Sequence, residues 1–297
     1  LAAAEAAPPG FVNLRLSGEA LERGLEALLE DPGHFGHDAR LKKKRVLIEF
    51  VSANPTGPLH LASGRAASLG ESLARVLKRL GHLVATECYV NDAGAQVELL
   101  GRSVQARWDE LKGRPGQVPE GGYKGEYVKE IAAKTPAEAE GWSPADFSRF
   151  AVEELLRVQR EDLEAFGVVF DRWFRESELH ASGAVQATLE FLKSRGKAYE
   201  KDGAVWLGTS TAKAADDKDR VLVRSDGRPT YFLPDIAYHK DKYDRGFELL
   251  IDVWGADHHG YVPRMKAAVA ALGREPGSFH AIVHQLVHLM RGKEAVK

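Results

Sequence analysis

With 297 residues, 44% of them hydrophobic and 28% charged, the chain has ample apolar material for a buried core and is long enough for two units. Its formal net charge of −2 argues against the broad basic surface that nonspecific binding of nucleic acid requires, although a local basic groove is compatible with it. The only cysteine, Cys88, excludes an intramolecular disulfide and a cysteine-rich metal cage, and no apolar run is long enough to span a membrane, so we expect a cytoplasmic protein.

The first 44 residues predict the end of a preceding domain and a linker. Residues 2–10 are rich in alanine and are interpreted as the linker itself. Residues 11–16 alternate like a short strand, and residues 21–29 have the spacing of a short helix. The basic run at 42–45 is interpreted as a solvated strand entrance rather than a nucleic-acid patch.

A strand, a helix and a second strand follow. Residues 46–51 form an apolar run broken only by Glu49, which is typical of a parallel strand covered on both faces. Apolar residues then recur at helical spacing over 62–80, where Gly81 ends the helix. Residues 83–90 predict the second strand. This pattern indicates a βαβ unit with a right-handed crossover.

The character of the chain changes over residues 108–228. Loops rich in glycine and proline lead to a long helix, which begins with Ser143 as its cap and a proline directly after it. A further helix is predicted at 185–194, and short strands at 204–207 and 220–224. We interpret this block as an insertion between two halves of an open α/β sheet.

The α/β pattern then resumes. Residues 247–254 predict another buried strand, 262–272 a helix, and 281–290 a strand-like stretch. The fold class is therefore α/β, a Rossmann-like parallel sheet split by an α+β connective insertion, with its first half at residues 45–107 and its second at 229–297.

The segment between the first strand and its helix predicts a phosphate site. His60 stands at this corner, where free backbone N–H groups and the helix dipole favour anions. In open α/β sheets, ligands bind beyond the carboxyl ends of the strands. The alternative is a histidine that merely caps the turn.

Two carboxylates lie in apolar surroundings. Glu49 is inside the first strand, and aromatic and aliphatic residues surround Asp235. A buried carboxylate is costly unless a cation neutralises it, so either a lysine or arginine of the chain pairs with each, or the cation arrives with a ligand. Two such acids and the nearby Tyr231 would suit a planar guanidinium. Internal salt bridges are an equally good interpretation.

The segment 255–259 follows a buried strand and could hold a ribose by its hydroxyls. A metal site is the alternative for His258 and His259, but no third ligand has suitable spacing, so no metal held by the protein is expected. Residues 284–288 resemble the zinc-protease helix, but Gln285 replaces the general-base glutamate, which argues against a protease.

Five segments, taken in order, resemble the arginyl-tRNA synthetases, which are class I aminoacyl-tRNA synthetases. Residues 48–60, which read IEFVSANPTGPLH, are similar to the first signature of that family. The strand ends YVNDAG at 89–94 and DVWGADH at 252–258 also match closely. Residues 9–13 resemble the end of its N-terminal additional domain, and residues 218–239 match as well. The resemblance covers nearly the whole chain.

This resemblance implies an enzyme that makes arginyl-adenylate from arginine and ATP, and then transfers the arginyl group to tRNA, which must be present for activation. Mg²⁺ would accompany ATP as its usual counter-ion, and the enzyme would be a monomer. The implied arginine-binding residues are Glu49, Ser52, Asn54, Tyr231 and Asp235. The implied ATP-binding residues are His60, Gly64, Gly255, Asp257 and His258.

The sequence departs from the family in two places, and both concern ATP. Ala62 and Ser63 replace the Gly-His that completes the first signature, and losing one donor of this kind typically costs on the order of 10²–10³ in rate. The chain stops at Lys297, which resembles the first lysine of the Lys-Met-Ser-Lys-Arg loop. The implied catalytic residues are thus His60, Ser63 and Lys297. A noncatalytic module that binds arginine or an adenylate is the alternative function.

Overall fold

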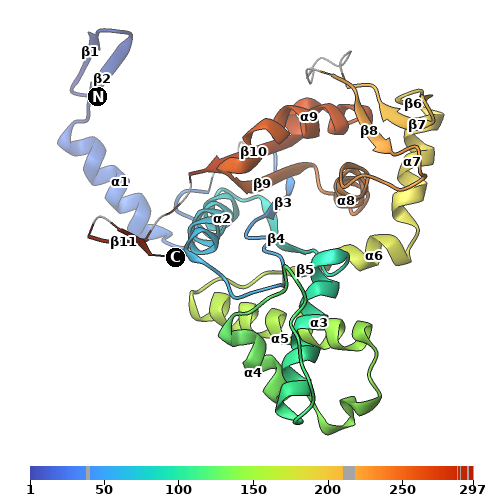
Figure 1. Cartoon of the computed structure of the whole chain (residues 1–297). Coiled ribbons are helices and arrows are strands. Elements are labelled where there is room, and N and C mark those ends of the chain that lie inside the picture. The colour runs from blue at the N-terminus through green and yellow to red at the C-terminus, as the bar shows by residue number, and fades with distance from the viewer. Residues whose placement is uncertain (38–40, 210–217, 286, 288, 293, 297) are drawn as a thin grey trace.

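A five-stranded parallel sheet forms the centre of the computed structural model, which describes residues 1–37, 41–209, 218–285, 287, 289–292 and 294–296 (Figure 1). The strands lie in the order β10-β9-β3-β4-β5, and every neighbouring pair is parallel. Taken in chain order, this is the 3-2-1-4-5 arrangement of a Rossmann-like sheet. The strands are β3 (Arg45–Glu49), β4 (Leu83–Val90), β5 (Arg172–Arg175), β9 (Leu249–Gly255) and β10 (Phe279–His284).

Helices cover both faces of this sheet, which explains why its central strand is apolar on both sides. On one face, α2 (Leu61–Arg79) packs in one cluster with Val46 and Ile48 of β3. On the other, Leu47 packs with α8 (Phe232–Asp244) and α9 (Val262–Ala271). The predicted α/β architecture is confirmed.

A helical unit lies between β4 and β5, at the bottom of Figure 1. It consists of α3 (Ala95–Leu111), α4 (Glu126–Lys134) and α5 (Pro144–Ala165), packed around one apolar cluster. The predicted cap of α5 is confirmed, because Ser143 and Asp146 exchange both hydrogen bonds of a capping box. The next strand, β5, comes from inside the predicted insertion but pairs with β4 in the central sheet.

A second group of elements connects β5 to α8. Helices α6 (Glu176–Ala181) and α7 (Ala184–Ser194) lead into a three-stranded antiparallel sheet of order β6-β7-β8. Its strands are β6 (Ala198–Lys201), β7 (Ala204–Leu207) and β8 (Arg220–Val223). The predicted helix and the two predicted strands of this region are confirmed.

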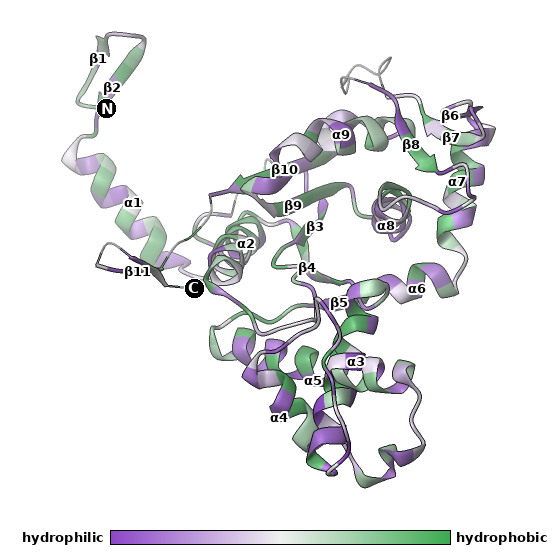
Figure 2. Cartoon of the chain, in the orientation of Figure 1, coloured by the Kyte–Doolittle hydropathy of each residue, from purple (hydrophilic) through white to green (hydrophobic). Residues whose placement is uncertain are grey.

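The N-terminal elements project away from the sheet (Figure 1). The prediction of a linker at residues 2–10 is wrong, because β1 (Ala3–Ala7) pairs antiparallel with β2 (Phe11–Arg15). Backbone pairing stabilises this hairpin, and alanine, a poor strand former, hid it. Helix α1 (Gly18–Glu30) begins at the Ser17 cap. Its apolar residues, where the ribbon is green in Figure 2, are all exposed or half-buried.

The C-terminal stretch also differs from its prediction. Instead of one strand over 281–290, β10 ends at His284 and a hairpin follows, formed by β11 (Leu289–Arg291) and β12 (Glu294–Val296). Among the described helices, none combines the length and the apolarity that crossing a bilayer requires.

Candidate active site

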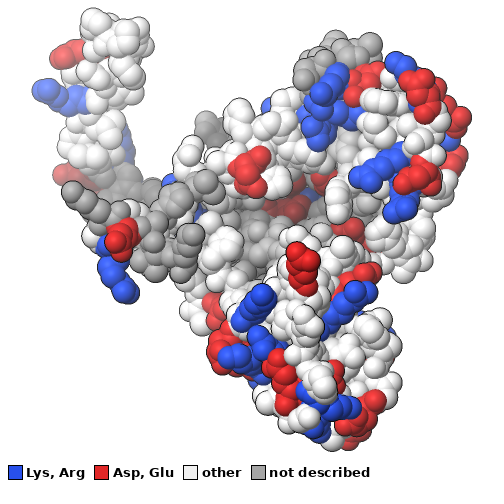
Figure 3. All heavy atoms as spheres, viewed as in Figure 1, with Lys and Arg blue, Asp and Glu red and all other residues white. Residues whose placement is uncertain are grey.

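The main pocket lies where the strand order reverses, beyond the carboxyl ends of β3 and β9, which is where ligands bind in sheets of this kind. It has a volume of about 400 Å³. Figure 3 shows acidic side chains in the recess at the centre of this face. The pocket is lined mainly by acids and aromatic residues, among them Glu49, Ser52, Tyr89, Glu176, Tyr231, Asp235, Tyr238, Asp252, Trp254, Gly255, His258 and Tyr261.

A strained turn forms one wall of the pocket. Val51 and Ser52, directly after β3, have φ angles of 68° and 41°, a region that a β-branched residue such as valine rarely adopts. The Ser52 hydroxyl donates to Glu49 Oε1 at 2.7 Å and accepts from the Tyr89 backbone N–H at 3.2 Å. One bond leads to Glu49 of β3 and the other to Tyr89 of β4, so together they fix Ser52 relative to both strands.

The cation that Glu49 requires comes from the chain itself. Lys242, which is 0% exposed, donates from Nζ to Glu49 Oε2 at 2.5 Å and to Asp252 Oδ1 at 3.0 Å. His239 Nε2 lies 2.9 Å from Asp252 Oδ2, and its Nδ1 lies 2.8 Å from the Asp235 backbone oxygen. Of the two interpretations left open for Glu49, the internal salt bridge is the one observed.

The ionisation of this cluster follows from burial and its charges. Burial raises the pKa of Glu49 against the attraction of Lys242. Burial and Lys242 oppose protonation of His239, but Asp252 and Asp235 outweigh them and raise its pKa to about 10. Both ring nitrogens of His239 face acceptors, as an imidazolium requires. Burial opposes ionisation of Asp252, yet Lys242 and His239 lower its pKa.

Two further carboxylates lie in the walls of the pocket, and Asp235 is the more open of them. Asp235 is in the first turn of α8; its side chain is 30% exposed, and Oδ2 accepts from the Tyr261 hydroxyl at 2.7 Å. It is therefore less buried than the sequence suggests. Glu176, at the start of α6, is 13% exposed, and burial together with this carboxylate raises the pKa of Tyr89.

Glu176 was missed by the sequence predictions. A usable signal exists, because Glu176 directly follows β5 and so stands at the same carboxyl edge as the residues after β3 and β9. The four-residue strand RWFR was itself not predicted, so the position of Glu176 at a strand end was not evident.

The pocket carries a surplus of negative charge. Four carboxylates line it, those of Glu49, Glu176, Asp235 and Asp252. Within the described part of the chain, Lys242 and the His239 imidazolium supply the two positive charges bonded to them. Asp235 also lies 3.3 Å from the His239 ring, and Glu176 lies 3.4 Å from the His180 ring. The lining still holds more carboxylates than buried cations, and in a partly buried site such charges favour cationic groups strongly.

The residues predicted to bind ATP fall into two places. Gly255 and His258 line the main pocket. A Cβ atom added at Gly255 would lie only 2.6 Å from Asp257 Oδ1, so the glycine lets the Asp257 side chain lie close to the backbone. His60 and Gly64 instead line a separate hollow of about 490 Å³ between α2 and α5. The structure therefore does not bring all five into one cavity.

The corner at His60 has the expected helix terminus. His60 occupies the N-cap position of α2, but its side chain makes no hydrogen bond to the backbone N–H groups of the first turn. It therefore does not cap the helix, as the alternative interpretation would require. Its Nδ1 lies 3.4 Å from the hydroxyl of Ser63, which is buried. Lys297, the third predicted catalytic residue, lies outside the described residues.

Asn54 is not in the lining of the main pocket; its Nδ2 donates to Gln96 Oε1 at 3.1 Å. The loop that carries it is held from the helical unit. The buried Gln159 donates to the Gly57 oxygen at 2.9 Å, and the Tyr127 hydroxyl donates to the Thr56 oxygen at 2.8 Å. These two anchors also escaped the sequence predictions.

Metal binding finds no geometric support in the described residues, among which no three His, Cys, Asp or Glu side chains are grouped as ligands. His284 ends a strand, β10, so it does not begin a zinc-protease helix; His288 lies outside the described residues.

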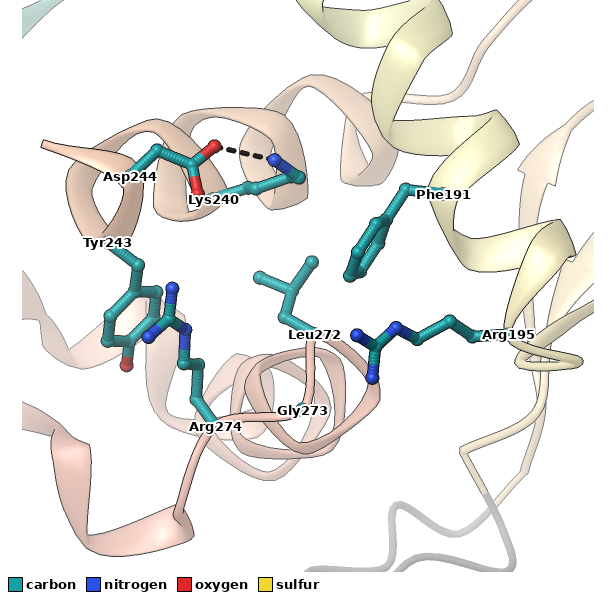
Figure 4. A pocket seen from close by; sticks show the side chains of 8 residues that line it. All are labelled: Phe191, Arg195, Lys240, Tyr243, Asp244, Leu272, Gly273 and Arg274. Carbon is teal, nitrogen blue, oxygen red and sulfur yellow. Dashed lines mark hydrogen bonds and ion pairs between the residues drawn. The ribbon is translucent and has the colours of Figure 1, made fainter.

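A second depression, of about 220 Å³, lies at the far end of α8 (Figure 4). Arg195 and Arg274 stand on either side of Leu272, and each guanidinium lies over an aromatic ring, at 4.9 Å and 4.8 Å from its centroid. Lys240 pairs with Asp244 at 2.5 Å. Helices α7, α8 and α9 all end here, and cations favour helix C-termini, so the local structure accounts for these charges.

Comparison with known proteins bears on the main pocket. A family model described as tRNA synthetases class I (R), catalytic domain, matches residues 25–297. Proteins named arginine–tRNA ligase are similar over the whole chain: one from Elusimicrobium minutum is 54% identical and one from Nitratidesulfovibrio vulgaris 46% identical, each over 100% of this chain. The chain covers 54% and 55% of those proteins, so it spans about half of their length.

Solved structures show the same fold. A structure from Campylobacter jejuni that carries the name arginyl tRNA synthetase has a TM-score of 0.82 and 37% identity, over 95% of this chain and 63% of that one. The Thermus thermophilus arginyl-tRNA synthetase has a TM-score of 0.66 over 98% of this chain and 56% of its own; at 22% identity this likeness concerns the fold.

Proposed function

This chain belongs to the family of class I tRNA synthetase catalytic domains denoted R, and on that premise we propose that it is the catalytic part of an ATP-dependent ligase that joins L-arginine to its tRNA through an arginyl-adenylate. The substrates are arginine, ATP and tRNA, and Mg²⁺ accompanies the ATP. The names of the relatives support this assignment.

The charge balance of the main pocket carries the proposal. Free arginine brings two cationic groups, a guanidinium and an α-ammonium, against one α-carboxylate, so its net charge of about +1 offsets part of the negative charge of the lining. Both oxygens of Glu49 already accept hydrogen bonds from Lys242 and Ser52, so Glu49 acts through the turn rather than on the guanidinium.

The guanidinium is then assigned to Asp235 and Glu176, the two lining carboxylates that Lys242 does not bind. Both line the same pocket as Tyr89. A guanidinium between two carboxylates gains charge-assisted hydrogen bonds that a lysine ammonium cannot match in geometry. Tyr231, which is 84% exposed at the rim, offers a ring for stacking, and Asn54 would approach the arginine only through movement of its loop.

ATP is assigned to residues in two places, the main pocket for its adenosine and the separate hollow between α2 and α5 for its phosphates. Gly255, Asp257 and His258 would receive the adenosine, while His60 and Gly64, at the N-terminus of α2, would meet the phosphates. Ser63 can donate a hydrogen bond from the place of the second signature histidine, but it carries no positive charge. Lys297 is proposed as a further phosphate contact.

Calorimetric titration tests the amino-acid assignment. We expect heat of binding for arginine and at least about tenfold weaker binding for lysine, because the two carboxylates favour a bidentate partner. Equal affinity for both amino acids would contradict the assignment to Asp235 and Glu176. Assays of arginyl-adenylate formation would contain tRNA as well as ATP.

The departure at Ala62 and Ser63 supports a second candidate, a module that binds arginine or an adenylate without catalysis. Ala62→Gly with Ser63→His tests it. If weak phosphate stabilisation limits the rate, the change raises ATP-dependent activity by on the order of 10². An active unchanged protein with no gain in the variant would remove this candidate.

We propose in addition a monomer that acts in the cytoplasm. The domain division we propose is residues 1–44 for the end of an additional domain, 45–107 and 229–297 for the two halves of the catalytic domain, and 108–228 for the connecting segment, from which β5 is assigned to the catalytic sheet.

A further inference from the structure

We propose that Lys242 is a positioning residue of the arginine pocket: its buried ammonium holds Glu49, and through Glu49 the strained turn at Val51 and Ser52, in the conformation that receives the substrate. This inference rests on the proposed function. The family resemblance assigns no role to Lys242.

Lys242 is fully buried and binds two of the carboxylates that line the pocket. It lies on α8 about two helical turns after Asp235, so one helix presents both residues toward the sheet. Its Nζ joins the two central strands, because Glu49 belongs to β3 and Asp252 to β9. The same ammonium lies 4.2 Å from the centre of the Tyr238 ring.

A continuous set of hydrogen bonds leads from this ammonium to the turn. Lys242 takes Glu49 Oε2, which leaves Oε1 to accept from the Ser52 hydroxyl at 2.7 Å. The Ser52 oxygen in turn accepts from the Tyr89 N–H at 3.2 Å. Four elements, α8, β3, the turn and β4, are thereby tied together.

The turn needs this support because its backbone is strained. Residues other than glycine are strained at positive φ and persist there only where their surroundings determine them. Without Lys242, Glu49 would be a buried carboxylate with no bonded cation, and burial already favours its protonated form. A protonated Glu49 would be a weaker acceptor for Ser52, and the turn would lose its anchor.

The second branch of the cluster reaches the guanidinium site. Asp252 is shared by Lys242 and His239, and His239 Nδ1 contacts the backbone oxygen of Asp235. Loss of the ammonium would therefore disturb the start of α8 as well as the turn. We expect the effect on arginine binding to exceed the effect on ATP binding.

The test compares the unchanged protein with Lys242→Met, which keeps the length of the side chain and removes its charge. We expect the KM for arginine to rise at least about tenfold, with a smaller change in the KM for ATP. Lys193→Met is the matched control, because Lys193 also pairs with a glutamate, Glu200, but on the surface. The control is expected to change neither constant by more than about twofold.

A paired variant keeps the test valid if Lys242→Met does not fold. Glu49→Gln with Lys242→Met removes both charges of the bond, and the glutamine oxygen can still accept from Ser52. If the single variant folds, we expect the pair to recover at least about half of the arginine affinity that the single change loses. If the single variant does not fold, we expect the pair to fold and to bind arginine within about tenfold of the unchanged protein, and a folded pair with no arginine binding would contradict the positioning role. A folded single variant with unchanged KM for arginine, or a pair no better than the single variant, would overturn the positioning role.

The unchanged protein separates this proposal from the proposed function. If it fails to bind arginine in calorimetry, the proposed function fails. If it binds arginine and Lys242→Met binds it equally well, the inference on Lys242 fails alone.

Discussion

The two ends of helix α8 carry charge clusters of opposite sign, and only one of them has the properties of a ligand site. At the first end, Asp235 faces a pocket with four carboxylates and two bonded cations. At the last end, Lys240 pairs with Asp244, and the arginines lie over rings beside helix C-termini (Figure 4). The difference teaches that a charge cluster indicates a ligand when burial leaves its charge uncompensated.

The strongest way to break this comparison is to remove one carboxylate from each end. Asp235→Asn keeps the shape and an acceptor for Tyr261 but removes the charge from the proposed guanidinium site. We expect the arginine affinity to fall on the order of 10²-fold, the usual cost of losing one partner of a desolvated charge pair. Calorimetry measures this directly.

The matched control is Asp244→Asn on the same helix, whose side chain is 53% exposed. Exposed ion pairs contribute little, so the control is expected to leave the arginine affinity within about twofold. Equal losses at both ends would mean that the position on α8, rather than burial, determines the effect.

Glu176 provides the next largest effect. Glu176→Gln is expected to weaken arginine binding by roughly 10 to 10²-fold, less than the change at Asp235 because Glu176 Oε1 also lies 3.4 Å from His180 Nε2, which takes up part of its charge. Glu190→Gln on α7, an exposed residue bonded to Gln186, is the control. Unchanged affinity in Glu176→Gln would leave Asp235 as the sole guanidinium partner among the residues proposed here.

The sequence predicted those parts of the site that local patterns determine. The periodicity of residues 46–90 is sufficient to predict β3, α2 and β4, and the apolar setting of Glu49 is sufficient to predict that a cation must neutralise it. The sequence could not identify that cation, because Lys242 is 193 positions from Glu49 in the chain and the contact forms only when α8 packs on the sheet.

Part of what escaped prediction depends on partners distant in the chain. The strand β5 has four residues and is stabilised by pairing with β4, so its sequence alone is too short to identify it, and Glu176 was missed with it. The hairpin of β1 and β2 has a different cause, because β1 reads AAEAA and alanine has little strand preference of its own.

The pH dependence of stability sharpens the comparison further. The pKa of His239 is raised from 6.5 to about 10 by Asp252 and Asp235, against burial and the nearby Lys242. Its contribution to stability is therefore complete below about pH 6.5 and is lost as the pH rises toward 10. We expect the free energy of unfolding to fall by on the order of 1 kcal/mol for each pH unit in this range.

His239→Gln is the variant that checks this assignment. Its free energy of unfolding should be lower near pH 6.5 and nearly independent of pH up to about 9, as measured by denaturant titration. A slope in the variant equal to that of the unchanged protein would assign the pH dependence to other groups.

The smallest effect is expected at the far end of α8. Arg274→Gln removes a cation beside the C-terminus of α9 and its contact with Tyr243, so we expect a loss of about 0.5–1 kcal/mol in the free energy of unfolding.

Inorganic phosphate should raise the melting temperature no more than chloride of equal ionic strength, because the helix carbonyls already offset the arginines. A saturable phosphate effect that Arg274→Gln abolishes would make this end a ligand site too, and exposed cations at helix ends would then be able to recruit anions without burial.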